Sequence, residues 1–420
     1  MRILPVPFNP LPPIAVIMLG AVLAGAPTAQ QPPAGPPPEG RGFGGRGGRG
    51  TSVKPGEECP PGTTEIRPDR CQAPEMPPPS IVDYRPRSTL VTAGHLVPKA
   101  KFPAIDFHGH PANLTASPEG LNTLIAAMDS VNLRVMVSAD NTSGDRLTRM
   151  LNVIRNSPHR DRLRVLTGVS FSGVGPGWAA KAIAQLEADL KAGAVGLGEI
   201  DKGFGLRTRK ADGSRLQLDD PDLDPFWEAC ARLKIPVFIH TADPSEFFRP
   251  IDAHNERWLE LALFGDRRYP PSEYPPFEQL MAERDRLFRK HPKTTFVAAH
   301  MGWHAHDLGR LGKMLDTMPN LYTEVGAVLY DIGRQPRAAH DFFVKYQDRL
   351  LFGKDAFQPE EYPSYWRVFE TKDDYFDYYR NYHAFWKLYG IDLPDAVLKK
   401  LYYQNALRLT PALPQTGWPK

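Results

Sequence analysis

The most constraining feature of this 420-residue chain is an alternation of short apolar runs with helix-period segments from residue 103 onward. Such alternation is typical of βα units, whose strands form a parallel sheet. Eight units in about 300 residues predict an α/β fold, a closed (β/α)8 TIM barrel, because a doubly wound sheet usually has about six strands. The eight expected strands are Ala104–His108, Leu133–Ser138, Leu163–Val169, Ala194–Ile200, Pro236–His240, Thr294–Ala299, Asn320–Val325 and Arg349–Gly353.

Helices are expected between these strands and after the last one. One connection, residues 241–276 after the fifth strand, is unusually long, and its Phe, Trp and Tyr content predicts an ordered lid. Beyond the eighth strand, the segments YWRVF and YFDYYRNYHAFWKLYG predict two aromatic helices, and Asp395–Leu407 predicts a closing amphipathic helix. The helices expected inside the barrel are Gly120–Val131, Gly144–Asn156, Trp178–Ala192, Asp222–Leu233, Phe277–Lys290 and His306–Thr317.

The first hundred residues have a different composition, with 21 of the 44 prolines. Residues 1–29 contain the apolar run Ile14–Ala26, which is shorter than the about 20 residues that a membrane-spanning helix needs. We interpret residues 1–29 as a signal peptide, so the protein is expected to be secreted or periplasmic, without stable membrane insertion after cleavage. A retained N-terminal anchor is the alternative. Residues 30–98 are expected to form a disordered Pro/Gly-rich linker that ends where the barrel domain, residues 99–415, begins.

The linker also contains two of the three cysteines. Cys59 and Cys71 flank a Pro-rich turn in the part expected to be exported, and an oxidising compartment makes a disulfide between them plausible. Cys230 lies in an apolar helical segment and is interpreted as a core residue.

Charge is distributed unevenly along the chain. The formal net charge is 51 − 48 = +3, and residues 1–50, with four Arg and one Glu, supply 4 − 1 = +3 of it. The remaining 370 residues are therefore balanced. A folded body without net charge argues against a nucleic-acid partner, because phosphate binding depends on an excess of Lys and Arg.

Histidines fall at the ends of the expected strands. His108 and His110 end the first strand, His240 the fifth and His300 the sixth, and Asp355 follows the eighth. In a barrel, the C-terminal ends of all strands converge on one mouth, so these residues should meet. Neutral imidazoles with a carboxylate suit zinc or a similar divalent ion, and an open coordination position would hold a water.

The motifs DFHGH, IH, AAHMG and GKDA at strands one, five, six and eight resemble the metal-dependent amidohydrolase superfamily, specifically its amidohydrolase-related branch of the aminocarboxymuconate-semialdehyde decarboxylase type. The closing YQNALRL is similar to the C-terminal helix of that branch, so the resemblance covers about residues 103–410. It implies that His108, His110, His240 and Asp355 are metal ligands. His300 is either a ligand of a second metal or an acid/base group.

Strand four carries Glu199 in the sequence GLGEID. This is similar to the Glu-bearing strand four of TatD-like members of the superfamily, and it implies that Glu199 is a metal ligand able to bridge two ions. The mononuclear branch takes no ligand from this strand, so the metal count, one ion or two, stays open. A carboxylate that orients a ligand or contacts substrate is the alternative role for Glu199.

Three further residues are candidates for substrate binding. Arg257, in the long loop, has a guanidinium suited to clamping a carboxylate, and an ion pair within the lid is the alternative. Lys202, next to the expected ligands, is either a substrate anchor or a solvated side chain. His304 follows the sixth strand, where it contacts substrate, supports a ligand or starts the next helix.

The resemblance implies a hydrolase, because most chemistry in that superfamily is hydrolytic and the expected export favours breakdown of external compounds. A bound divalent ion lowers the pKa of its water to about 7, and Asp355 would carry the proton of the attacking water to the leaving group. His300 would stabilise charge on the attacked carbonyl oxygen. The expected reaction is cleavage of an amide, ester or lactone in a small molecule. The alternatives are non-oxidative decarboxylation of a small carboxylic acid and a non-catalytic metal-binding protein. The family resemblance also suggests a homodimer.

Overall fold

A computed structural model of the chain describes residues 50–383 and 385–419. The chain divides into two compact units, Met1–Pro79 and Ser80–Lys420. The expected signal peptide lies outside the described residues, as do residues 30–49 of the expected linker. In the part of the chain that is described, no helix combines the length and apolar character needed to cross a membrane.

The described part of the first unit is a small antiparallel sheet. Its strands β1 (Thr51–Ser52), β2 (Thr64–Arg67) and β3 (Arg70–Gln72) lie in the order β1-β3-β2. Cys59 and Cys71 form a disulfide with a Cα–Cα distance of 5.6 Å. Closing a loop of this length stabilises a fold by about 3 kcal/mol, which matters because Cys71 is the one buried apolar residue among residues 50–79.

The second unit is built on nine parallel strands in the order β11-β10-β9-β8-β7-β6-β5-β4-β12. The two outermost strands are consecutive in the chain and are separated by residues 352–354. β11 lies within the expected eighth strand and pairs with β10, whereas β12 lies just beyond that strand and pairs with β4. The backbone N–H of Phe107 also bonds to the carbonyl of Phe352 at 2.9 Å. The sheet therefore closes at this segment, and the predicted TIM barrel is confirmed. The strands are β4 (Ala104–His110), β5 (Leu133–Thr142), β6 (Leu163–Thr167), β7 (Leu197–Ile200), β8 (Pro236–Ile239), β9 (Thr295–Ala298), β10 (Leu321–Glu324), β11 (Leu350–Leu351) and β12 (Asp355–Ala356).

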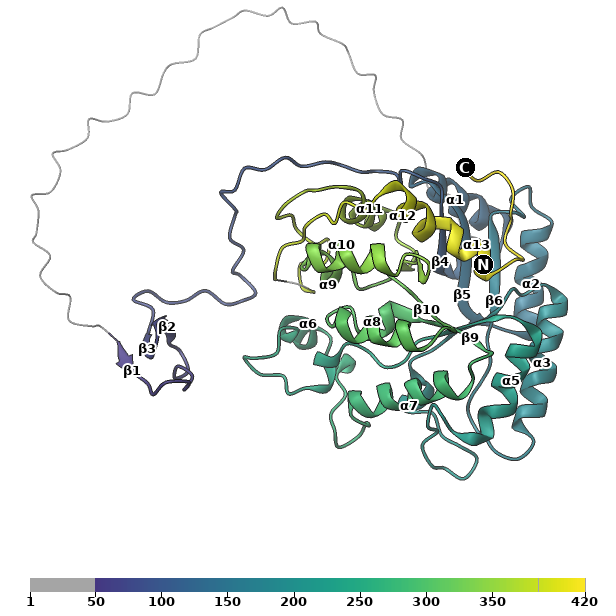
Figure 1. Ribbon diagram of the computed structural model, residues 1–420, viewed down its shortest axis with the longest axis horizontal. Coiled ribbons are helices and arrows are strands. Elements are labelled where there is room, and N and C mark those ends of the chain that lie inside the picture. The colour runs from purple at the N-terminus through teal and green to yellow at the C-terminus, as the bar shows by residue number, and fades with distance from the viewer. Residues whose placement is uncertain (1–49, 384, 420) are drawn as a thin grey trace, which may run out of the picture. The chain divides into compact units, whose positions relative to one another are not determined.

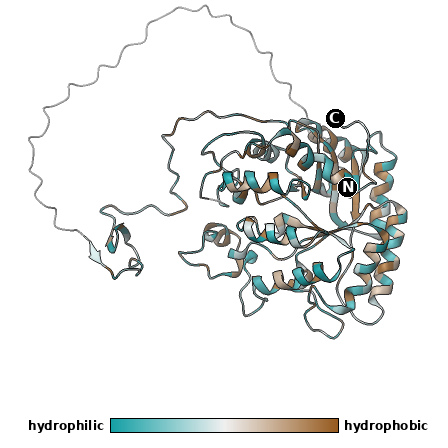
Figure 2. Ribbon diagram, viewed as in Figure 1, coloured by the Kyte–Doolittle hydropathy of each residue, from teal (hydrophilic) through white to brown (hydrophobic). Residues whose placement is uncertain are grey.

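Helices cover the outside of the sheet (Figure 1). Each helix presents an apolar stripe toward the sheet and its polar residues toward solvent (Figure 2). In α2, the buried residues of this stripe are Leu147, Met150, Leu151 and Ile154. All six helices expected in the barrel are present, with ends that differ from the predicted ones by at most a few residues. The helices are α1 (Pro118–Ser130), α2 (Gly144–Arg155), α3 (Trp178–Ala192), α5 (Asp224–Leu233), α7 (Phe277–Lys290), α8 (Leu308–Thr317) and α10 (Pro336–Lys345).

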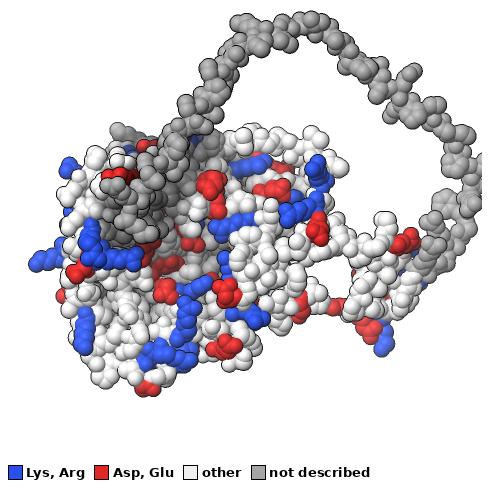
Figure 3. Space-filling model, turned by 180° about the vertical axis from the view of Figure 1, so that it is seen from behind, with Lys and Arg blue, Asp and Glu red and all other residues white. Residues whose placement is uncertain are grey.

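The surface of the described chain carries both signs of charge. On the face shown in Figure 3, Lys and Arg side chains are interspersed with Asp and Glu side chains. That face has no large area of a single sign, in line with the charge balance of residues 51–420.

The long connection after β8 is ordered, with a 3-10 turn at Ser245–Phe248 and the short helix α6 (Trp258–Leu263). After α11 (Tyr362–Glu370), the predicted second aromatic helix is wrong, because the described residues 371–383 and 385–394 contain no helix. Phe376 and Leu388 exchange two backbone hydrogen bonds instead, which fold this segment back on itself. The closing helix is continuous over residues 395–409, with a π-helical turn at Lys400–Gln404.

Candidate metal centre

Four histidines and two carboxylates, contributed by the ends of β4, β7, β8 and β9 and by the start of β12, meet at the mouth of the barrel. The Nε2 atoms of His108 and His110 are 3.2 Å apart. Glu199 places one carboxylate oxygen 3.3 Å from the first of these nitrogens and the other 3.2 Å from the second. Ligands of one tetrahedral zinc ion lie about 3.3 Å apart. Asp355 completes this group, with Oδ1 3.7 Å from His110 Nε2 and 4.0 Å from His108 Nε2.

A second group shares Glu199. The Nδ1 atom of His240 lies 2.8 Å from Glu199 Oε1, and the Nε2 atom of His300 lies 3.9 Å from the same oxygen. The ligand atoms of these three residues all lie within 4.8 Å of one another. Glu199 therefore contacts both groups, one through His108 and His110 and the other through His240 and His300.

The local backbone is shaped to bring these side chains together. Gly109 lets β4 approach β5 closely, because a Cβ at this position would lie 2.4 Å from Met136 Cγ. His300 and Asp355 both adopt left-handed backbone conformations, with φ of 58° and 81°. This region costs about 1–3 kcal/mol for residues other than glycine, and such strain clusters at functional sites.

Hydrogen bonds fix which nitrogen of each imidazole faces the cluster. His300 Nδ1 donates to the carbonyl of Gly326 at 2.9 Å, because a carbonyl only accepts. His108 Nδ1 is 3.1 Å from a Glu324 oxygen, and His110 Nδ1 is 3.1 Å from an Asp140 oxygen. With Nδ1 donating in all three rings, the neutral imidazoles direct Nε2 lone pairs into the cluster.

This arrangement fits a bound cation. Two lone pairs 3.2 Å apart, at His108 and His110, repel unless a proton or a metal ion lies between them. Four imidazole nitrogens with two carboxylates also form the donor set that zinc and similar divalent ions prefer. The residues present therefore suit a divalent metal.

Without metal, the cluster binds protons instead. Burial disfavours the charged imidazole, but hydrogen bonds to Asp140 and Glu199 raise the pKa of His110 to about 9. Burial acts on His240 in the same way, yet Glu199 and Asp243 raise its pKa to about 9 as well. Burial would raise the pKa of Glu199, but His108 and His240 hold it well below its ordinary value.

These pKa directions predict that metal affinity depends on pH. A metal ion must displace the protons of His110 and His240 below pH 9, so we expect affinity to fall by about tenfold per pH unit for each proton displaced. Above about pH 9 the dependence should flatten. Chelator competition from pH 6 to pH 10 measures this, and an affinity that is constant between pH 7 and pH 9 would contradict it.

Comparison with known proteins decides the family. A family model described as Amidohydrolase matches residues 105–411, most of the chain. The chain belongs to the amidohydrolase family. This confirms the resemblance noted in the sequence and the expectation of an enzyme. No curated protein matches the chain.

Solved structures similar to this amidohydrolase are of low sequence identity. An uncharacterised TIM-barrel protein from Bordetella bronchiseptica is 16% identical, with 74% of this chain and 99% of that chain covered and a TM-score of 0.44. A dihydroxybenzoic acid decarboxylase from Polaromonas, solved with manganese and 2-nitroresorcinol, is 15% identical, with 73% and 96% covered and a TM-score of 0.44. A 5-carboxyvanillate decarboxylase from Sphingomonas paucimobilis is 14% identical, with 74% and 99% covered and a TM-score of 0.42.

Several carboxylates of the amidohydrolase that support the cluster were missed in the sequence. Glu324, at the end of β10, accepts from the backbone N–H of His300 at 2.6 Å and is bonded to His108. Asp140 holds His110, and Asp243 lies 3.7 Å from His240 Nε2. Asp106 accepts from the backbone N–H of His108 at 3.0 Å. Asp140 and Glu324 lie near the ends of β5 and β10, so the strand-end rule applied to histidines could have found these two.

Replacing Glu324 by Gln is expected to weaken metal binding by about 10–100-fold, because an amide holds the His108 ring less strongly than a carboxylate does. The matched control is Glu278→Gln, an exposed carboxylate on α7. Chelator competition on both variants measures the effect. Equal affinity in Glu324→Gln and wild type would show that this contact does not tune the site.

The three residues expected to bind substrate all contact other side chains, and one of them contacts a carboxylate beside the cluster. Lys202 Nζ pairs with Asp243 at 2.6 Å. Arg257 is buried, and its guanidinium pairs with Glu260 and lies 4.4 Å from the Tyr330 ring centroid. Arg257 therefore makes the ion pair within the long loop that was considered as the alternative to a substrate clamp. His304 is buried, with Nε2 3.2 Å from the guanidinium of Arg284.

Proposed function

We propose that this amidohydrolase is a metal-dependent hydrolase that uses an activated water to cleave an amide, ester or lactone bond in a small molecule. The observation that carries the proposal is the Asp355 carboxylate, which is 37% exposed at the barrel mouth beside four imidazoles and a second carboxylate. A divalent ion held there, with zinc the ion we favour, supplies a Lewis acid and lowers the pKa of a bound water.

The residues of the chain divide the remaining work. His108, His110, Glu199 and Asp355 would hold one ion, and Glu199, His240 and His300 a second. Asp355 accepts the proton of the attacking water and delivers it to the leaving group. Burial would raise its pKa, but His108 and His300 lower it, so the carboxylate is ionised and ready to accept at neutral pH.

The Nδ1 proton of His300 is committed to Gly326, which leaves only a lone pair on Nε2. A nitrogen without a hydrogen cannot donate a hydrogen bond to a substrate oxygen. This supports the ligand role for His300 over the role of stabilising the carbonyl oxygen.

The metal count is tested by Glu199. If this carboxylate bridges, we expect two ions per chain in the wild type and one in Glu199→Ala, because the second group would keep only His240 and His300. Elemental analysis after dialysis measures both proteins. A single ion in both would refute bridging.

The reaction is tested with metal-loaded protein on a panel of amides, esters, lactones and aromatic carboxylates. Release of an acid together with an amine or alcohol supports hydrolysis. Release of carbon dioxide supports the second candidate, a decarboxylase, which is favoured by two arginines, Arg207 and Arg209, that line a pocket near the site. Metal binding without turnover across the panel would point to a non-catalytic protein.

We also propose export. The apolar run Ile14–Ala26 and the Cys59–Cys71 disulfide support it, since disulfides persist in oxidising compartments. N-terminal sequencing of protein recovered outside the cytoplasm tests it, and an intact Met1 would argue against signal cleavage. A homodimer is proposed on the family resemblance, and light scattering tests it.

A further inference from the structure

A pocket of about 490 Å³ opens where the end of β5 meets the segments after β6 and β7. Its volume is in the range of sites that bind small molecules. Two of its residues connect it to the metal centre along the chain. Ile200 directly follows Glu199, and Asn141 directly follows Asp140, which holds His110. The pocket and the metal centre therefore share the ends of β5 and β7.

One wall of the pocket is aromatic and firmly packed. The ring centroids of Phe171 and Phe204 are 4.5 Å apart, with an angle of 30° between the rings. Both side chains are largely buried, and Phe171 stacks on Trp227 at 5.8 Å. This wall suits a flat or apolar body in a ligand.

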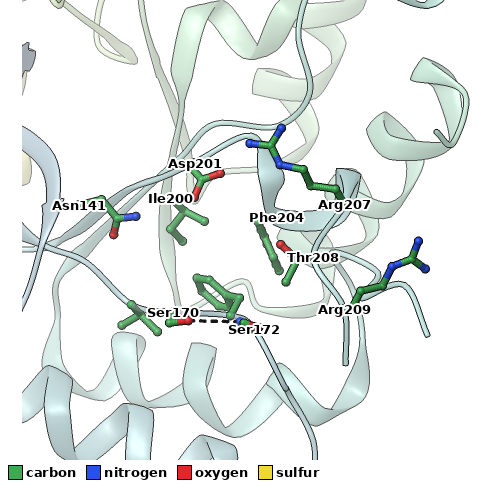
Figure 4. Close-up of a pocket in the computed structure, with 11 residues that line it drawn as sticks. Asn141, Ser170, Ser172, Ile200, Asp201, Phe204, Arg207, Thr208 and Arg209 are labelled. Carbon is green, nitrogen blue, oxygen red and sulfur yellow. Dashed lines mark hydrogen bonds between the residues drawn. The ribbon is translucent and has the colours of Figure 1, made fainter. Parts of the chain in front are cut away.

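The lining also carries unpaired positive charge. Arg207 and Arg209 are exposed, and no described residue makes an ion pair or hydrogen bond with either guanidinium. Figure 4 shows Arg207 reaching toward the side on which Asp201 lies, whereas Arg209 is directed outward. The Asp201 carboxylate, the acidic group of the lining, accepts from the backbone N–H of Gly203 at 2.6 Å.

Nearby cations on the same segment are paired, in contrast to these two. Lys210 contacts Asp220 and Asp222 at 2.9 and 2.8 Å, and Arg215 makes a two-point ion pair with Glu283. These contacts lie on a hairpin whose strands are joined by bonds such as Leu216 N–H to Thr208 carbonyl at 2.9 Å. The hairpin is anchored, so Arg207 is presented from a fixed backbone.

We propose that this pocket binds a carboxylate group of the substrate, with Arg207 as its main partner and Arg209 adding positive potential. The substrate class is then a small amide, ester or lactone that has an aromatic or apolar body and a free carboxylate away from the scissile bond. A guanidinium suits this role because its planar fork matches a carboxylate. This inference rests on the proposed hydrolase for the identity of the scissile bond, but the binding of the carboxylate does not require turnover.

The test compares two ligands that cannot be hydrolysed, 3-phenylpropanoate and the neutral 3-phenylpropan-1-ol. Their dissociation constants are measured by NMR titration of metal-loaded wild type, Arg207→Gln, Arg209→Gln and the control Arg289→Gln, an exposed arginine on α7. We expect Arg207→Gln to raise the dissociation constant of 3-phenylpropanoate about tenfold. The dissociation constant of the alcohol should stay within about twofold of its wild-type value. Arg209→Gln should weaken the carboxylate by about two- to threefold, and Arg289→Gln should change neither ligand.

Equal affinity of wild type and Arg207→Gln for 3-phenylpropanoate would overturn the proposal, since the carboxylate would then bind elsewhere, for example at the metal. Equal weakening of both ligands would overturn it too, because loss of packing and not of charge would explain the result. Absence of turnover on the substrate panel would refute the hydrolase and leave this binding result standing, so the two failures are distinguishable.

Discussion

Asp355→Asn is expected to lower kcat by about 10³-fold on the best substrate of the panel while the protein keeps its metal. General acid/base groups contribute about 10²–10⁴-fold, and an amide cannot accept the proton that the carboxylate carries. His108, His110 and Glu199 remain to hold the ion, since their ligand atoms lie 3.2–3.3 Å apart. The measurement is steady-state kinetics combined with elemental analysis of the same sample.

The pH profile separates this role from a general loss of structure. Neighbouring His108 and His300 lower the pKa of Asp355. In the wild type, the rate should therefore fall only as pH drops through the acidic range where the carboxylate becomes protonated. The pH–rate profile of Asp355→Asn should lack this acidic decrease. A metal-loaded Asp355→Asn with kcat within tenfold of wild type would rule out Asp355 as the proton carrier.

His108→Ala is expected to remove most of the metal and to lower kcat/KM by at least about 10³-fold. His108 is fully buried, and its Nε2 lies 3.2 Å from His110 Nε2 and 3.3 Å from a Glu199 oxygen. Removal of its ring takes one ligand from the group that it forms with His110 and Glu199. Elemental analysis and kinetics measure the two effects together.

The matched control for this change is His306→Ala, an exposed histidine beyond the sixth strand. It should retain both metal and activity. Because His108 also packs against Phe238, with ring centroids 4.6 Å apart, His108→Gln provides a bulkier second variant, and thermal unfolding shows whether each variant folds. A folded His108 variant with full metal content would show that the ligand assignment is wrong.

The barrel could be predicted because it depends on local patterns. Alternating strands and helices fix the order of the elements, and the convergence of strand ends in a barrel is general to the fold. From this convergence, the sequence analysis predicted that His108, His240 and His300 lie close together although they are far apart in the sequence. The prediction of a second aromatic helix was wrong because tertiary packing determines the conformation of that segment. Tyr378 and His383 are buried there in a loop that is closed by backbone hydrogen bonds and contains no helix.

The orientation of the ligands could not be predicted from sequence. It depends on distances between elements, such as the 3.1 Å contact of Glu324 with His108 and the carbonyl of Gly326 that fixes the His300 ring. The end of the linker was equally hidden. The division after Pro79 groups residues 80–98 with the barrel, where His95 bonds to Asp373, whereas composition alone placed the boundary at residue 98.

The central claim is that one divalent ion is coordinated by the side chains of His108, His110, Glu199 and Asp355. Crystals of protein loaded with zinc, with data collected above and below the zinc absorption edge, test it directly. We predict an anomalous peak within about 2.0–2.3 Å of the Nε2 atoms of His108 and His110. Anomalous density that is absent there, or that lies away from these imidazoles, would contradict the account.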